Sequence, residues 1–498
     1  MPKFVFLATD VVLVLLLAAI AFYIWHVRRT PQLAATWKPV FRDGVAMASL
    51  TVLASFLVIA AIDSVHYRPQ LAAAPGAASD AATAYSTRTF SLLDAALGRA
   101  MDAKEKTYST PLATRSFDKE TMLVGDKPVR EYPRLAYGGA HLKDDASEWG
   151  ADVSARSVAG LAAGAFVAAL VWLAVAAARA RRHGLTVLAS LRQVLRGESE
   201  IPWRAVLITA SLMLLFAGWV VALWPHYHVF GTDRTGNDVL YQALKSVRTA
   251  IVIGSLATLA TLPFAIVFGI TAGYFRGWVD DVIQYLYTTL SSIPSVLLIA
   301  AAVLMIQVFI DKNPQLYETG LERADVRLFL LAVIIGVTGW ATLARLLRAE
   351  TLKISQLDYV QAARAFGVSH TNVMRRHVFP NVMHIVLIVA VLDFSGIVLY
   401  EAVLSYVGVG VDPTTNSFGA MINAGRNEMS RDPVVWWNLA TAFAFMISMV
   451  LAANLFAGAV REAFDPRARA FRVRRAKPVI PATETGLAAS STAPAAAR

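Results

Sequence analysis

Two carboxyl side chains lie eight residues apart in one long apolar run of the chain. Asp393 and Glu401 are the only Asp, Glu, Lys or Arg residues between positions 382 and 406. On a helix this spacing separates them by about 80°, so both can face one cavity or one partner helix. An ionisable group in hydrocarbon costs at least about 2.5 kcal/mol and is a functional candidate by default. We therefore predict that both line a translocation pathway, unless Glu401 simply reaches the lipid headgroups from the outer end of its helix.

A run of small, polar and basic residues precedes this apolar stretch. It starts with Gln361-Ala362-Ala363-Arg364, continues through Gly367, and ends at Pro380. We expect a short helix, a reversal at Gly367 and a second helix, because glycine accepts backbone angles that other residues avoid. The two alanines would let the backbone of a partner approach closely, and Pro380 would begin the next apolar helix cleanly. The alternative interpretation is an ordinary basic connecting loop.

The sequence lacks the motifs of the common nucleotide and metal sites. No Gly-x-x-x-x-Gly-Lys-Ser/Thr run offers a phosphate-binding loop, and no His-Glu-x-x-His run offers a zinc site. The chain has no cysteine, which excludes disulfides and thiolate ligands. His226 and His228 alone would make a weak metal site, and such scattered histidines are more often surface or structural residues. We therefore expect no catalytic, cofactor-binding or metal-binding residues in this chain.

Long apolar helices must position these residues. Of the 498 residues 56% are hydrophobic and 16% are charged, whereas soluble proteins carry about 45–50% and about 25%. A membrane-spanning helix needs about 20 mostly apolar residues. Nine segments qualify: 4–25, 45–62, 158–178, 206–224, 250–274, 282–310, 327–347, 382–406 and 435–460. We therefore predict an all-α fold, a polytopic transmembrane helical bundle.

The distribution of Lys and Arg predicts the orientation of this bundle. These residues gather after the first, third, seventh and ninth apolar segments. Cytoplasmic segments carry the excess of positive charge, so we expect nine spans with a periplasmic N-terminus and a cytoplasmic C-terminus. The net charge of +11 then reflects topology and not nucleic-acid binding. The first segment could instead be a cleaved signal peptide, but Arg28 and Arg29 follow it as a stop-transfer flank would.

The chain divides into five parts. Residues 1–63 hold two spans, 64–157 form a periplasmic insertion, 158–203 hold the third span and a cytoplasmic linker, 204–465 form a six-span core, and 466–498 form a basic, disordered tail. The insertion has helix-like spacing at residues 91–97. It is either a small docking domain or a loosely ordered segment.

The segment 361–380 resembles the loop that permeases of ABC importers present to their ATPases. In that family a Glu-Ala-Ala run is followed by three residues, a Gly and, thirteen positions later, a Pro. Gly367 and Pro380 keep this spacing, and Gln361 stands in place of the Glu. That replacement removes a charge but keeps the length of the side chain and its ability to form hydrogen bonds.

Further runs resemble the C-type permeases of dipeptide and oligopeptide importers. In chain order they are 228–240, 273–281, Ile293-Pro294, 340–345 and 401–410. Asn237 replaces an Arg of the family, and Asn237 or Asp238 is expected to cap a helix on the outer membrane surface before the fifth span. As in the family, we expect a helix break at Ile293-Pro294. Residues before about 185 extend the usual six-span subunit, unless an insertion has split the first region of the family, which residues 37–42 faintly resemble.

The resemblance implies a permease subunit of an ATP-driven importer of dipeptides or oligopeptides in the bacterial inner membrane. It implies three kinds of protein partner: a second permease subunit in a heterodimer, cytoplasmic ABC ATPase subunits that grip 361–380 and bind ATP and Mg, and a periplasmic substrate-binding protein. Membrane lipid is the remaining partner. The chain itself is then no enzyme, holds no cofactor and binds no nucleic acid.

Two other classes of protein are compatible with a helical membrane bundle. A secondary transporter that works alone should show inverted repeats and several paired charges at the membrane midplane, and neither is clear in the sequence. A membrane-anchored sensor would depend on residues 64–156 and not on the later spans.

Overall fold

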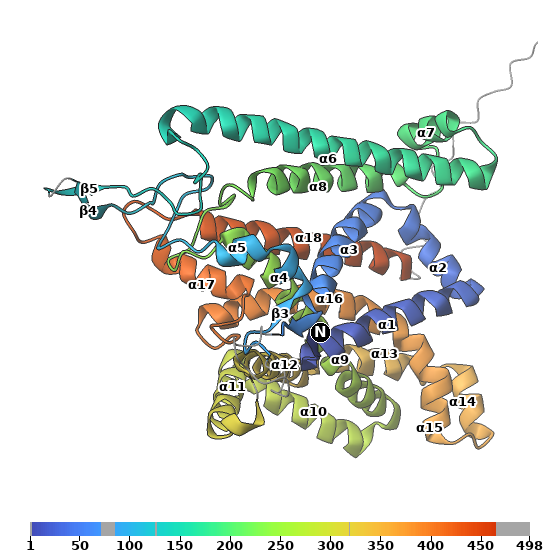
Figure 1. Ribbon diagram of the computed structural model, residues 1–498. Helices are drawn as coiled ribbons and strands as arrows, with labels where there is room; N and C mark the ends of the chain where they lie inside the picture. Colours follow the sequence, from blue (N-terminus) through green and yellow to red (C-terminus); the bar gives the residue numbers. More distant parts are fainter. Residues whose placement is uncertain (1, 71–84, 125–126, 318, 465–498) are drawn as a thin grey trace, which may run out of the picture.

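The computed structural model describes residues 2–70, 85–124, 127–317 and 319–464, and helices dominate them (Figure 1). Within this described part, nine helical stretches are long and apolar enough to cross a membrane. They are Ala8–Arg29, Gly44–Asp63, Asp145–His183, Trp203–Leu223, Val239–Phe275, Ser295–Lys312, Gly320–Ile354, His370–Tyr406 and Trp437–Phe464. The prediction of an all-α polytopic bundle is confirmed. The predicted tail, 466–498, lies outside the described residues.

The sixth and seventh apolar segments are each broken into two helices. The sixth forms α10 (Gly277–Ser292) and α11 (Ser295–Lys312), separated at Ile293 and Pro294 where the sequence predicts a break. Proline has no N–H to continue the helical hydrogen bonds, so α11 starts afresh after it. The seventh forms α12 (Gly320–Gly339) and α13 (Ala341–Ile354). Helices α10, α12 and α13, which adjoin these breaks, all contact α9.

Helix α9 (Val239–Phe275) corrects one expectation. The residues after Asp238 do not form a separate helix on the membrane surface, because they continue without a break into the fifth span. Asp238 does cap the helix, and its Oδ1 accepts a hydrogen bond from Tyr241 N at 3.0 Å. Most residues of the first five turns are buried, including every residue from Ser246 to Leu256, so packing on several sides holds this end of the helix in line.

Helix α9 is the centre of the bundle. It contacts α3 (Gly44–Asp63), α12, α13, α16 (Phe379–Tyr406) and α18 (Trp437–Phe464). Helix α1 (Ala8–Arg29) packs against α12 and α9. Helices α6 (Asp145–His183) and α8 (Trp203–Leu223) form a separate pair at one side of the bundle, which reaches the rest through α3 (Figure 1). Gly160, Gly164 and Gly218 allow this pair to approach backbone to backbone.

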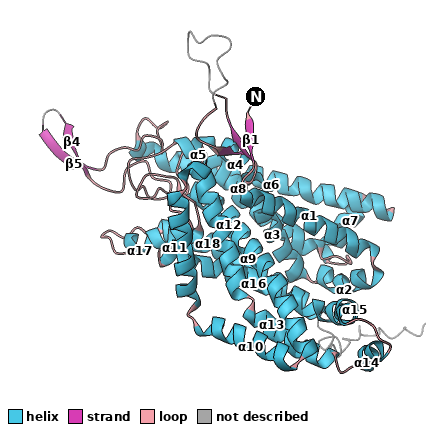
Figure 2. Ribbon diagram, turned by 90° about the horizontal axis from the view of Figure 1, so that it is seen from below, coloured by secondary structure: helices cyan, strands magenta, loops and turns pink. Residues whose placement is uncertain are grey.

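Short elements gather at the two ends of the bundle (Figures 1 and 2). At one end lie α2 (Pro31–Arg42), α7 (Val187–Arg196), α14 (Asp358–Ala365), α15 (His370–Val373) and the π-helical turn Met374–Val378. At the other end lie β1 (Lys3–Val5), β2 (His66–Arg68), β3 (Phe90–Ser91), α4 (Leu92–Ala96), α5 (Gly98–Asp102), β4 (Glu120–Val124), β5 (Lys127–Glu131), the 3₁₀ turn Pro314–Leu316 and α17 (Phe418–Glu428). Strands β1, β2 and β3 form an antiparallel sheet in that order, and β4 pairs with β5. The helix expected at 91–97 is α4, capped by Ser91.

Candidate functional site

The segment 361–380 has the shape that its sequence predicts. Helix α14 ends at Ala365, the chain reverses at Gly367, and α15 follows. Gly367 has a φ of +77°, in the left-handed region, and the amide of Val368 closes the helix end by donating to Ala363 O at 3.1 Å. A Cβ at position 367 would meet nothing within 4 Å. The glycine is therefore needed for its backbone conformation and not because a neighbour would clash with a larger side chain.

One face of this segment is anchored in the core. Val360, Val373 and Val378 are fully buried in a single cluster with Trp340 of the α12–α13 junction and Val382 of α16. In addition, Tyr274 Oη lies 2.9 Å from His370 Nδ1, which ties α15 to the end of α9. A displacement of 361–380 must therefore move the ends of α9, α13 and α16 with it.

The opposite face of the segment is exposed and partly apolar. Phe366 is 87% exposed, and Leu357 and Tyr359 are also exposed. Gln361, the residue in place of the family's Glu, is exposed and donates from Nε2 to Gln356 O at 3.0 Å. Neighbouring Ala362 is exposed as well. An exposed apolar group on a rigidly anchored segment is typical of a surface that a partner protein covers.

Pro380 does not start its helix cleanly, which corrects the prediction. It lies in the first turn of α16, but the π-helical turn Met374–Val378 joins α16 directly to α15. A proline lacks the N–H that would bond to the carbonyl four residues earlier, and a wider turn relieves the resulting clash. The segment is therefore continuous with the span that follows it.

An ion pair that the sequence did not reveal braces the same end of the bundle. Asp280 of α10 accepts two hydrogen bonds from Arg348 of α13, at 2.5 and 2.6 Å. These hydrogen bonds lower the pKa of the Asp280 carboxyl, against the opposing effect of its partial burial. A bidentate pair of this kind fixes orientation as well as distance. It links the tight turn after α9 to the helix that leads into 361–380.

The two predicted pathway carboxyls lie in different environments. Glu401 is only 2% exposed, and its Oε1 accepts a hydrogen bond from Ser405 Oγ at 2.7 Å. The alternative that it reaches the headgroups is therefore wrong. Asp393 is half-buried, two turns earlier on α16. Whether either carboxyl lines the pathway stays a prediction.

At the opposite end of the bundle, residues 228–238 form a loop on which the insertion docks. Ser109 N donates to Thr232 Oγ1 at 2.7 Å, and Thr232 N donates to Ser109 O at 3.1 Å. Gly236 has a φ of +78°, and a Cβ there would lie 1.9 Å from Glu105 O. The glycine is required because the insertion passes so close. The described part of the insertion around Ser109 is therefore packed and not loosely ordered.

A buried histidine secures this contact. His228 Nδ1 lies 2.8 Å from Asp238 Oδ2, and its Nε2 lies 3.5 Å from Glu105 Oε1. Burial works against protonation, but the two carboxylates outweigh it and raise the pKa of His228 to about 9. Burial likewise opposes the ionisation of Glu105, yet hydrogen bonds from His228 and three backbone amides lower its pKa to about 2. Both ring nitrogens of His228 thus face carboxylates, one from the start of α9 and one from the insertion.

Buried ion pairs connect the first helices to the core. Arg248 Nη2 of α9 lies 2.6 Å from Asp10 Oδ1, and Asp10 Oδ2 lies 2.8 Å from His66 Nδ1. Asp10 is therefore buried against the core. Lys245 Nζ, one turn earlier, lies 2.7 Å from Asp63 and 2.9 Å from Asp94. These contacts join α1, α3 and the insertion to one side of α9.

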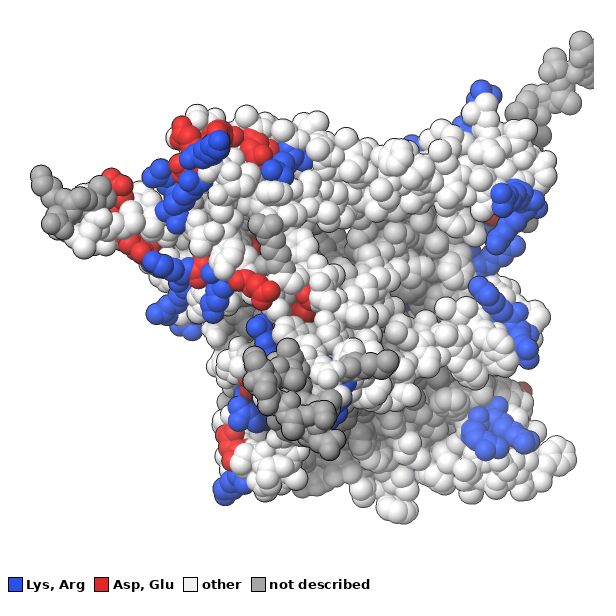
Figure 3. Space-filling view, in the orientation of Figure 1, with Lys and Arg blue, Asp and Glu red and all other residues white. Residues whose placement is uncertain are grey.

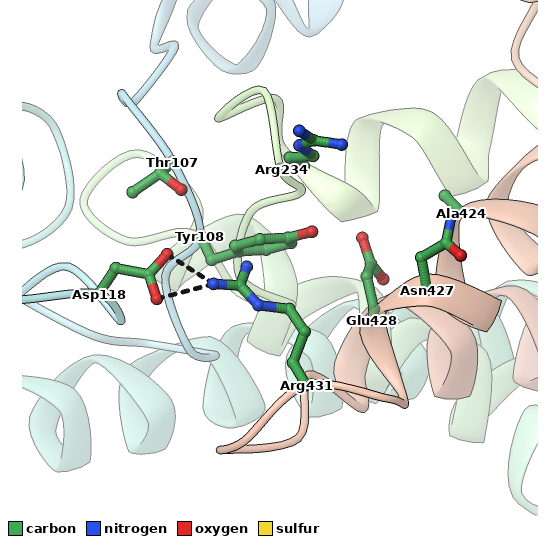
Figure 4. Close-up of a pocket in the computed structure, with 8 residues that line it drawn as sticks. All are labelled: Thr107, Tyr108, Asp118, Arg234, Ala424, Asn427, Glu428 and Arg431. Atoms are coloured by element: carbon green, nitrogen blue, oxygen red, sulfur yellow. Dashed lines mark hydrogen bonds and ion pairs between the residues drawn. The ribbon is translucent and has the colours of Figure 1, made fainter.

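A polar pocket of about 590 Å³ lies between the insertion and α17 (Figure 4). It is lined by Thr107, Tyr108, Asp118, Arg234, Ala424, Asn427, Glu428 and Arg431. Arg431 makes two hydrogen bonds to Asp118, at 3.0 and 3.2 Å, and its guanidinium stacks 4.7 Å from the ring centre of Tyr108. Glu428 is 2% exposed, and burial outweighs the nearby Arg431 and raises the pKa of its carboxyl. The sequence did not reveal this pocket, because its residues come from three distant segments.

No metal centre is evident in the described part of the chain. Among these residues no three His, Asp or Glu side chains are grouped so that they could hold a metal ion.

The C-terminal half of the chain is similar in sequence to known transport proteins. Residues 265–470 match the family described as binding-protein-dependent transport system inner membrane component. The oligopeptide transport system permease protein OppC of Haemophilus influenzae is 28% identical over 243 residues, which cover 49% of this chain and 71% of that protein. OppC of Escherichia coli K12 is 29% identical, covering 49% and 73%, and OppC of Bacillus subtilis is 27% identical, covering 49% and 72%.

The matched region contains α10 to α18 and the segment 361–380, so the sequence matches and the geometry concern the same helices. The chain is thus a multi-pass membrane protein whose C-terminal half belongs to the ABC importer permeases of the oligopeptide family.

Proposed function

We propose that this permease subunit moves dipeptides or oligopeptides across the bacterial inner membrane, and that ATPase subunits drive it by gripping 361–380. The relatives that it matches are named oligopeptide permeases. The observation that carries the proposal is the two-faced segment itself. Its exposed face offers Phe366 to a partner, and its buried face is fastened to the core through Val373 and through Val360, which directly precedes it.

Force on this segment has a rigid path into the membrane. Val360 and Val373 pack with the α12–α13 junction and the start of α16, and the Asp280–Arg348 pair adds α10. Packed interiors shift between discrete arrangements and do not deform smoothly. Closure of the ATPases would therefore rock α9, α13 and α16 together between inward-open and outward-open states.

The charges on the surface support the orientation predicted from the sequence. In Figure 3 Lys and Arg stand almost alone at the end that carries α2, α7 and α14, and both signs mix at the opposite end. Positive charge accumulates on the cytoplasmic side. We therefore place α14 and the C-terminal tail inside, and β1, the insertion and α17 in the periplasm.

Further subunits complete the transporter. Trp278 and Tyr285 of α10 and Met305 of α11 are at least 72% exposed, and a second permease subunit in a heterodimer would cover this face, with lipid around the remainder. A periplasmic substrate-binding protein would deliver peptide beside α17. The ATPase subunits would bind ATP and Mg, while this chain would hold no cofactor and catalyse no reaction.

The packing favours one of the two interpretations of the N-terminal region. Helix α3 contacts α9 and α18, whereas α8 packs along α6 and α3. We propose that α3 occupies the place of the family's first span. The insertion and the α6–α8 pair would then interrupt the permease between α3 and α9.

The test is a bulky residue at the exposed reversal of 361–380. Gly367→Trp should leave membrane insertion intact and uncouple ATP hydrolysis from peptide uptake in the reconstituted transporter, because it fills the space where the ATPase must fit. Gly197→Trp is the matched control, since Gly197 also has a positive φ and free space around it. Full uptake by Gly367→Trp would refute the proposal. Uptake without any ATPase subunit would favour a secondary transporter.

A further inference from the structure

We propose that the pocket between the insertion and α17 binds the two charged ends of a short zwitterionic peptide on the periplasmic side. The identification of the ligand as a peptide rests on the proposed function, whereas its charge pattern comes from the pocket. The volume of about 590 Å³ lies within the range of about 300–1,000 Å³ that small-molecule sites occupy.

The walls of the pocket are held in place from several sides. Tyr108 and Glu428 are almost fully buried. Asn438 Nδ2 donates to Glu428 Oε2 at 3.1 Å, which fixes the carboxyl. Arg431 is fixed by Asp118 beside it and by the ring of Tyr108. The pocket therefore exists before a ligand arrives and needs little reorganisation to bind one.

Apart from the Asp118–Arg431 ion pair, the pocket offers a ligand one acidic and one basic side chain. Asp118 and Arg431 neutralise each other, which leaves the carboxyl of Glu428 and the guanidinium of Arg234. Arg234 is exposed, and none of the ion pairs among the described residues includes it. In Figure 4 the carboxyl of Glu428 lies next to the hydroxyl end of Tyr108, and Arg234 lies farther from that hydroxyl, on the loop before α9.

This arrangement selects a ligand that carries both charges. A simple anion would be attracted by Arg234 but repelled by Glu428, and a simple cation would be attracted by Glu428 but repelled by Arg234. None of the ion pairs among the described residues includes Glu428, so an ammonium group would give its buried carboxyl a direct ionic partner, and a carboxylate would pair with Arg234. An unblocked peptide carries these two groups at its ends, while its backbone can bond to Asn427 and Thr107 at the wall.

The insertion supplies part of the pocket wall. It contributes Thr107, Tyr108 and Asp118, while the permease contributes Arg234, Glu428 and Arg431. The site therefore exists only where the insertion docks on the outer loop and α17. Peptide released outside the membrane would be held here, close to the outer ends of the transport helices.

The experiment uses the full chain assembled with its partner subunits in lipid nanodiscs, without a binding protein. Calorimetry would measure the binding of trialanine, N-acetyl-trialanine and trialanine amide. Charged hydrogen bonds contribute about 1.5–3 kcal/mol, so each blocked peptide should bind about 10- to 100-fold more weakly. The Glu428→Gln variant should bind trialanine and N-acetyl-trialanine with equal affinity. The Arg234→Gln variant should bind trialanine and trialanine amide with equal affinity. The control is Arg426→Gln, because Arg426 lies on α17 with Glu428 but does not line the pocket.

Equal binding of the blocked and free peptides, or no saturable binding, would overturn the inference. If Glu428→Gln did not fold, the exposed Arg234→Gln and the blocked peptides would still decide it. ATP-driven uptake of trialanine by the wild-type transporter tests the proposed function separately. If uptake did not change with Arg234→Gln or with blocking of the peptide ends, the peptide-binding role of the pocket would be refuted and the proposed function would stand. If peptide bound but ATP did not drive its uptake, the proposed function would be refuted and the binding role of the pocket would stand.

Discussion

The buried His228 makes the docking of the insertion sensitive to pH and to one substitution. Its pKa rises from 6.5 to about 9 in the folded protein. At about 1.36 kcal/mol per pKa unit, protonated His228 stabilises the docked insertion by about 3 kcal/mol. Replacement by leucine removes this cation and leaves Asp238 and Glu105 facing each other without it, and the loss of one partner from a buried pair costs about 3–5 kcal/mol.

The direction of the pH effect follows from the raised pKa. The contribution of His228 is complete below pH 6.5 and is lost as the pH rises toward 9. The lowered pKa of Glu105 acts at the other extreme, where its contribution is lost as the pH falls from 4.5 toward 2. The wild-type insertion should therefore dock most firmly between about pH 4.5 and 6.5, and His228→Leu should differ from wild type more at pH 6 than at pH 9.

Hydrogen exchange of residues 103–118 reports this docking directly, since the amide of Leu112 donates to His228 O at 2.9 Å. Exchange times would be scaled to the intrinsic rate at each pH. The control is His141→Asn, which removes a partly exposed pair with Asp152 and should cost no more than about 1 kcal/mol. Equal protection in His228→Leu and wild type at pH 6, or a difference that does not shrink by pH 9, would refute this reasoning.

Three further predictions concern the core and the 361–380 segment. Val360→Ala removes two buried methyl groups, so the thermal stability should fall by about 2 kcal/mol and uptake per ATP should fall with it; unchanged coupling would count against the anchoring role of Val360. Lys245→Met leaves Asp63 and Asp94 unpaired and should cost about 3–5 kcal/mol in a thermal melt, with partial rescue by Asp94→Asn; no loss of stability would contradict the pairing. Gly367→Asn should retain more uptake than Gly367→Val because asparagine tolerates a positive φ; the reverse order would exclude the backbone explanation.

The sequence predicted those features that depend on local patterns. The apolar runs predicted the spans because a helix that crosses lipid must satisfy its own backbone. Gly367 predicted the reversal after α14, because glycine permits backbone angles that other residues avoid. The break between α10 and α11 at Pro294 was expected from the resemblance to the permease family. The cap at Asp238 was also predicted, although the helix that it starts runs on into the membrane.

Contacts between distant segments could not be predicted in this way. Asp10 and Arg248 are 238 residues apart in the chain, and nothing in either neighbourhood indicates that they pair. The pocket depends on residues as far apart as Asp118 and Arg431, whose meeting requires the insertion to dock first. The sequence also could not decide between the two environments of Glu401, because burial at a helix end depends on what packs there.

The orientation of 361–380 is the claim on which the transport account depends, and one cysteine measures it. The chain has no native cysteine, so Phe366→Cys, at an 87% exposed position, gives a single reactive thiol. A membrane-impermeant maleimide would be applied to inside-out and right-side-out vesicles that lack the ATPase, and then to inside-out vesicles after its addition. We predict labelling only in inside-out vesicles and protection once the ATPase binds. Labelling in right-side-out vesicles, or labelling that the ATPase leaves unchanged, would contradict the account.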